Sequence, residues 1–151
     1  MKSQILIKLT LSILGIFLIT GNLFSQEKLP VEKITTEWTL FQEVKGVKFY
    51  IKKDIHQAEG GSNNVDYALV KLENTTNKEI SVSYSLAVHY AEGCKGCNSS
   101  ENNKKIAIPS NSSVTGNTAD GFSPVATLLI NHNQKDSYIP LFISTENLII
   151  K

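Results

Sequence analysis

The chain has 151 residues, with 15 basic residues against 14 acidic ones and a formal net charge of +1. Every basic residue is a lysine, so the chain lacks the arginine side chains that bind phosphates in a bidentate manner, and it has no excess of positive charge. The composition therefore argues against nucleic-acid binding.

Residues 1–25 have the pattern of a secretory signal peptide. Two positive charges, Lys2 and Lys8, precede an apolar run that ends at Ile19, and small or polar residues follow as far as Ser25. A membrane span needs about 20 apolar residues, and this run is shorter and diluted by polar residues. We expect cleavage after Ser25, export to the periplasm or the cell exterior, and no stable membrane anchor afterwards.

Cleavage would leave 126 residues, which is the size of one domain. Loss of two lysines would leave 13 basic residues against 14 acidic ones, a net charge of −1. We expect a flexible lead-in over residues 26–33, which contain Pro30, and a single folded domain over residues 34–151.

The folded part alternates apolar and polar residues with period 2, the pattern of β-strands. The clearest run is Ile80 to Tyr90, where isoleucine, valine, tyrosine and leucine share one face and serines share the other. One face of this strand is expected in the core and the other in water or only lightly covered. Val65 to Glu73 predicts a second strand, and the short polar connection between the two runs predicts a hairpin.

Two further runs, Glu37 to Val44 and Val47 to Lys53, predict another hairpin, with Gly46 in the turn. Trp38 and Leu40 are expected to contribute to its core face. Strands are also expected at 104–109, around 114, at 125–131 and over 138–151. The total of seven to eight short strands predicts an all-β protein with an antiparallel sandwich fold, with a small barrel as the alternative.

Four short runs resemble small exported immunoglobulin-like proteins that are common in Bacteroidetes. These runs are Gly46-Val47-Lys48-Phe49-Tyr50, Val70-Lys71-Leu72-Glu73-Asn74-Thr75-Thr76-Asn77, Cys94-Lys95-Gly96-Cys97-Asn98 and Ile108-Pro109-Ser110-Asn111-Ser112. The resemblance covers about residues 44 to 151. It implies an immunoglobulin-like sandwich and an exported location, and it transfers no catalytic residue.

Cys94 and Cys97 are the only two cysteines of the chain. In an exported protein such a pair is expected to form a disulfide. No helical pattern follows the motif, so the helix N-terminus that lowers a thiol pKa in redox proteins is not expected. The alternative is thiol-redox or metal-handling chemistry, with His89 and His132 (or His56) completing a metal site with the two cysteines.

Other motifs give weaker signals. Ser123 lies in a sequence that begins like the nucleophile turn of hydrolases but continues with a proline where a helix should start. Asn63, Asn64 and Asp66 could hold calcium, although solvated loop polarity is the favoured interpretation. The glycosylation pattern occurs at Asn74, Asn98 and Asn111. We favour turn chemistry for these asparagines.

Taken together, these patterns predict a non-catalytic binding or structural accessory module, with no cofactor and an unknown protein or glycan ligand. The alternative function is the thiol-redox or metal chemistry of the cysteine pair.

Export can be tested by mass spectrometry of the protein made in its native host. We expect a mature chain that begins at Gln26, because the apolar run is too short to span a membrane and ends in small residues. A full-length chain in the membrane fraction would contradict this prediction.

Overall fold

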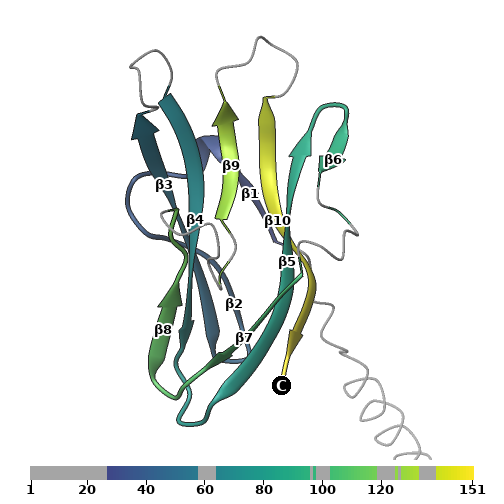
Figure 1. The fold of residues 1–151 in the computed structure, drawn as a ribbon. Helices are drawn as coiled ribbons and strands as arrows, with labels where there is room; N and C mark the ends of the chain where they lie inside the picture. Colours follow the sequence, from purple (N-terminus) through teal and green to yellow (C-terminus); the bar gives the residue numbers. More distant parts are fainter. Residues whose placement is uncertain are drawn as a thin grey trace, which may run out of the picture.

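The computed structural model describes residues 27–57, 64–95, 97, 103–118, 125, 127–132 and 139–151. Within these residues the chain forms ten strands in two antiparallel sheets (Figure 1), so the predicted all-β sandwich is confirmed and the barrel alternative is wrong. Sheet A contains β1 (Lys28–Pro30), β10 (Pro140–Ile150), β5 (Ile80–Tyr90), β6 (Gly93–Lys95) and β7 (Lys104–Ile108). Sheet B contains β2 (Thr39–Val44), β3 (Val47–Gln57), β4 (Asn64–Asn74), β8 (Ser112–Thr115) and β9 (Thr127–His132).

The strand count exceeds the expected seven to eight because β1 and β6 have only three residues each. A run of that length is too short to show a period-2 pattern. β1 pairs with β10, and the 3-10 turn η2 (Val31–Lys33) then leads to the buried Ile34. The segment 26–33, expected to be a flexible lead-in, thus contains a paired strand and a 3-10 turn from Lys28 onward. Residues 1–26 lie outside the described residues, so the signal peptide stays a prediction, as does the immunoglobulin-like classification.

The β2–β3 hairpin is confirmed, with the predicted turn at Lys45-Gly46. Both residues have positive φ, 49° and 77°, as the favoured two-residue hairpin turn requires. A Cβ on Gly46 would lie 2.5 Å from Cγ2 of Thr76. Both the backbone conformation and the close approach of Thr76 therefore require glycine at this position.

The predicted hairpin between β4 and β5 is wrong, because β4 belongs to sheet B and β5 to sheet A. The connection between them, residues 75–79, crosses from one sheet to the other at the lower end of the molecule in Figure 1. The apolar faces of both strands are buried, and they face one another across the sandwich. Local turn composition could not distinguish this crossing from a hairpin.

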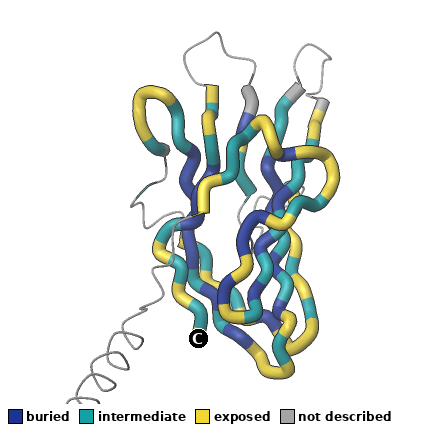
Figure 2. The backbone as a smooth tube through the Cα atoms, turned by 180° about the vertical axis from the view of Figure 1, so that it is seen from behind, coloured by how far each residue is buried: buried dark blue, intermediate teal, exposed yellow. Residues whose placement is uncertain are grey.

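Apolar side chains from the facing sides of both sheets form one core, and Figure 2 shows the exposed positions gathered mainly at the turns. Phe49 of β3 and Tyr84 of β5 meet edge to face across the sandwich, with ring centroids 5.5 Å apart. One buried polar pair also joins the sheets, since Thr145 Oγ1 donates to Gln42 Oε1 at 2.7 Å.

The outer side of β5 is more covered than its serine-rich sequence suggests. Ser85 and Ala87 are fully buried, while Ser81 and Ser83 are half-buried. A bulge in β10 between Glu146 and Ile149 accompanies this cover. At the bulge Asn147 has a φ of 52°, and its amide donates to Ser85 Oγ.

Asn74, the last residue of β4, is fully buried at the crossing between the sheets. Its Nδ2 lies 2.7 Å from the carbonyl oxygen of Lys78 and 3.0 Å from those of Ile108 and Pro109. Its Oδ1 accepts hydrogen bonds from the backbone N–H and the hydroxyl of Thr76. One side chain therefore ties the end of sheet B to the crossing connection and to the end of β7 in sheet A.

Replacing Asn74 with aspartate should strongly destabilise the fold. The change removes two N–H donors and places a carboxylate against three carbonyl oxygens in a buried position, and each unsatisfied buried group costs about 1–3 kcal/mol. We expect urea unfolding to show a loss of about 3 kcal/mol or more. Asn77→Asp is the matched control, because Asn77 is an exposed residue of the same connection. Equal stability of the two variants would contradict the assigned role.

Candidate functional site

The cysteine pair lies at the end of sheet A, where β5 turns through Ala91-Glu92 into the short strand β6. Cys94 and Cys97 are disulfide-bonded, as predicted, with their Cα atoms 5.8 Å apart, within the usual range for a disulfide. Register places Cys94 directly across from His89 of β5. The strand pairing thus brings the histidine to the disulfide.

His89 has contacts on several sides. Its ring stacks on Phe142, with centroids 4.2 Å apart and planes 16° apart. Its Nε2 lies 2.8 Å from Ser144 Oγ and 4.0 Å from Cys97 Sγ. The Ser144 hydroxyl donates to Glu146 Oε1 at 2.8 Å, so the hydrogen between His89 and Ser144 belongs to Nε2. The Nε2–H group therefore donates to Ser144 Oγ, and Cys97 Sγ lies 4.0 Å from the same nitrogen.

Burial lowers the pKa of His89 below its ordinary value of 6.5. The negative charge of Glu146 opposes this shift, and the positive charge of Lys28 adds to it. His89 is therefore neutral near pH 7. Ser144 is buried between His89 and Glu146, so the polar chain positions the imidazole and does not present an exposed nucleophile.

Three of the four candidate metal ligands come together. One ligand atom from each of His89, Cys94 and Cys97 lies within 4.8 Å of the others. His132 belongs to β9 of sheet B, where it pairs with Val65, and its side chain lies outside the described residues. His56 projects from β3 of sheet B and has other partners. The expectation that His56 could complete the set is therefore wrong.

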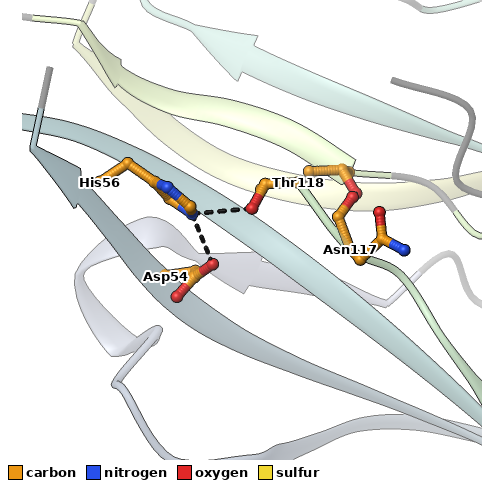
Figure 3. Close-up of polar contacts among 5 residues, drawn as sticks. Asp54, His56, Asn117 and Thr118 are labelled. Carbon is orange, nitrogen blue, oxygen red and sulfur yellow. Dashed lines mark hydrogen bonds and ion pairs between the residues drawn. The ribbon is translucent and has the colours of Figure 1, made fainter. Parts of the chain in front are cut away.

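His56 forms a separate polar cluster on β3 (Figure 3). Asp54 Oδ2 and Thr118 Oγ1 lie 2.8 Å and 2.7 Å from the same ring nitrogen, Nε2. A catalytic Ser-His-Asp relay uses one ring nitrogen for the acid and the other for the nucleophile. This cluster does not have that arrangement. The histidine instead connects the segment after β8 to β3.

The outer side of sheet B carries a group of aromatic and lysine side chains that the sequence did not single out. Tyr50 and Lys52 alternate with the buried residues of β3, and Tyr67 and Lys71 do the same on β4. Trp38, just before β2, lies next to them: Nζ of Lys52 and Nζ of Lys71 are each 5.1 Å from the centroid of its ring. We call Trp38, Tyr50, Lys52, Tyr67 and Lys71 the aromatic face.

The expectation that Trp38 and Leu40 supply core is wrong. Trp38 is half-buried and Leu40 is 49% exposed, whereas Phe41 and Val44 are buried. The cause is a register shift in the β2–β3 pairing between Leu40 and Gln42. A bulge of this kind changes which residues of the strand face inward. The signal available in the sequence was the Lys48-x-Tyr50-x-Lys52 alternation opposite the core residues of β3.

A hydrogen bond and several charged side chains position the residues of the aromatic face. The hydrogen bond to Glu73, followed by weaker contributions that include the charge of Glu43, raises the pKa of Tyr50. Nζ of Lys71 lies 4.3 Å from the centroid of the Tyr50 ring. Lys48 lies across from Glu43 on β2 and from Glu73 on β4. Acidic and basic side chains therefore alternate around the rings.

The remaining sequence motifs do not form sites in the described residues. Asn74 is buried and fully bonded, so the glycosylation pattern there is a structural motif. Asn111 occupies an exposed turn with a φ of 50°. Asp66 pairs with Lys53 at 3.7 Å. Ser123, Asn63 and Asn98, together with the side chain of Asn64, lie outside the described residues.

The lowered pKa of His89 predicts a pH effect on stability. As the pH falls below about 6.5, the unfolded chain takes up a proton at His89 that the folded chain still excludes, so the free energy of unfolding falls. Urea unfolding should therefore lose less stability between pH 7.5 and pH 5.5 in His89→Gln than in the unmodified protein. The same loss in both proteins would contradict the burial effect.

Among the described residues, no helix is long and apolar enough to cross a membrane. No family model, no curated protein and no solved structure matches the chain. The geometry gives two candidate sites, the disulfide with His89 on sheet A and the aromatic face on sheet B.

Proposed function

We propose that this protein is an exported, non-catalytic binding module that binds a glycan with its aromatic face. The main support is that a lysine holds two aromatic rings together on the outer side of sheet B. Nζ of Lys71 lies 5.1 Å from the ring centroid of Trp38 and 4.3 Å from the ring centroid of Tyr50. Trp38 lies just before β2 and Tyr50 belongs to β3, yet a single cation lies over both rings. Such cation–π contacts are favourable and limit the freedom of the side chains.

Side chains that are already held by contacts lose less entropy when a ligand binds. The aromatic face lies on paired strands: Tyr50 is directly across from Lys71, and Lys52 is directly across from Leu69. Leu69 alternates with the core residues of β4 and therefore lies on the outer side of the sheet, yet it is buried. Neighbouring groups thus cover the middle of this surface. Little rearrangement is therefore needed before a ligand binds.

The composition of the surface favours a glycan over a protein partner. The centre of a protein interface is usually depleted of charged residues. Here lysines and glutamates alternate with the rings, and Lys48 lies between Glu43 and Glu73. A sugar ring has C–H groups that pack on an aromatic side chain and hydroxyls that bond to lysine and carboxylate groups. The named basic and acidic groups, three lysines and two glutamates, nearly balance one another, which favours a neutral glycan.

The second candidate function is thiol-redox or metal chemistry at the disulfide. The observation that favours it is the contact between His89 Nε2 and Cys97 Sγ at 4.0 Å. It uses the other sheet and does not compete with glycan binding.

The proposal can be tested by measuring binding to a panel of neutral polysaccharides (cellulose, xylan, mannan and starch) and acidic ones (alginate and pectin). We expect the protein to bind at least one of the neutral polysaccharides. Trp38→Ala should weaken that binding by about tenfold or more, because it removes a central aromatic contact.

Phe142→Ala is the matched control, because Phe142 is an aromatic residue of the other sheet that stacks on His89. This variant should bind as the unmodified protein does. Binding only to acidic polysaccharides, no binding to any member of the panel, or equal binding by Trp38→Ala would each overturn the proposal.

A further inference from the structure

A histidine ring nitrogen lies beside one of the two sulfurs of the disulfide. His89 Nε2 lies 4.0 Å from Cys97 Sγ, and the same nitrogen bonds to Ser144, whose hydroxyl is held by Glu146. Phe142 fixes the plane of the ring by stacking. A purely structural disulfide has no need of such an arrangement, because its sulfurs carry no charge.

The Nε2–H group of His89 donates to Ser144 while the disulfide is closed, but a thiolate on the nearby sulfur would be the stronger acceptor because it is charged. Thiol–disulfide exchange releases one of the two sulfurs as a thiolate, and the exchange is faster when that leaving group is stabilised. Thiolates are stabilised by neighbouring hydrogen-bond donors, by positively charged side chains or by a helix N-terminus. The sequence after Cys97 has no helical pattern, and His89 could supply the donor from the adjacent strand β5.

We propose that Cys94–Cys97 is an exchangeable disulfide that accepts two electrons from an external dithiol, with His89 stabilising Cys97 as the leaving thiolate. This activity is independent of glycan binding, since it uses sheet A and the aromatic face belongs to sheet B.

A thiolate of the external dithiol attacks Cys94 Sγ and forms a mixed disulfide, while the Cys94–Cys97 bond breaks and its electron pair stays on Cys97 Sγ. The second thiol of the dithiol, after losing its proton, attacks its own sulfur in the mixed disulfide and releases Cys94 as a thiolate. Two protons, equal in number to those lost by the dithiol, end on Cys94 and Cys97. The protein gains two electrons, and the external dithiol becomes a disulfide.

Cys97 is assigned as the leaving group because its sulfur is the one within bonding distance of His89. Cys94 lies across the ladder from His89 and is left to receive the attack. The imidazole therefore contacts a reacting atom, and Ser144 and Glu146 act through it as positioning residues.

The test is the rate at which dithiothreitol reduces the disulfide of the folded full chain at pH 7, followed by labelling of free thiols. We expect His89→Phe to react about tenfold or more slowly, because it keeps an aromatic ring for stacking but removes the hydrogen bond to a charged sulfur. His89→Gln, whose amide can still donate, should recover part of the rate. His56→Phe is the matched control on the other sheet and should react as the unmodified protein does. Circular dichroism checks that each variant is folded.

An unchanged rate in His89→Phe would overturn the proposal, and so would equal slowing by His89→Gln, since that would indicate a packing effect. Zinc added to the reduced protein gives a further outcome, because His89, Cys94 and Cys97 lie within metal-binding distance of one another. If one zinc ion binds and prevents reoxidation by oxidised glutathione, the cluster is a metal site and the exchange proposal fails. If His89→Phe fails to fold, the unmodified protein is compared with a free peptide that contains the same Cys-x-x-Cys sequence. The exchange proposal is overturned if dithiothreitol reduces the protein no faster than the peptide.

Discussion

The fold depends on how the buried amide of Asn74 satisfies backbone groups where the chain leaves one sheet for the other. Three carbonyl oxygens from two segments converge on its Nδ2, and no solvent is available there to replace these bonds. Thr75 adds a second tie, since its N–H and its hydroxyl both donate to the carbonyl of Gly46. These contacts join the β2–β3 turn, the crossing connection and the end of β7, where the two sheets meet with their apolar faces together.

Once the sandwich is closed, its two outer surfaces carry different chemistry. Sheet B has rings and alternating charges, which suit reversible contact with a ligand rather than bond making. Sheet A has a disulfide beside an oriented imidazole, which suits electron exchange. Since the core separates the two surfaces, a change at one is not expected to disturb the other. A protein built this way could bind a glycan while its disulfide responds to thiols in the same compartment.

Much of this arrangement follows from local sequence, and the exceptions have physical causes. The alternation in β5 and the Lys45-Gly46 turn predict strands and a hairpin correctly, because side-chain period and turn geometry are local properties. The location of Trp38 depends on a bulge near Leu40, which a two-residue period cannot reveal. The sheet assignment of β5 depends on what packs against it. The contact between His89 and Cys97 depends on the register of β5 and β6 across a short turn. The sequence could therefore name both residues as candidates but could not predict that they lie next to each other.

Trp38 allows the most direct measurement of the central claim, because it is the only tryptophan of the chain. Its fluorescence can be followed while a soluble oligosaccharide from the retained polysaccharide is added, with binding measured in parallel by calorimetry. If the aromatic face is the binding surface, the emission of Trp38 should change saturably with the same dissociation constant that calorimetry gives. Calorimetric binding that leaves the emission of Trp38 unchanged would place the ligand elsewhere and contradict the account.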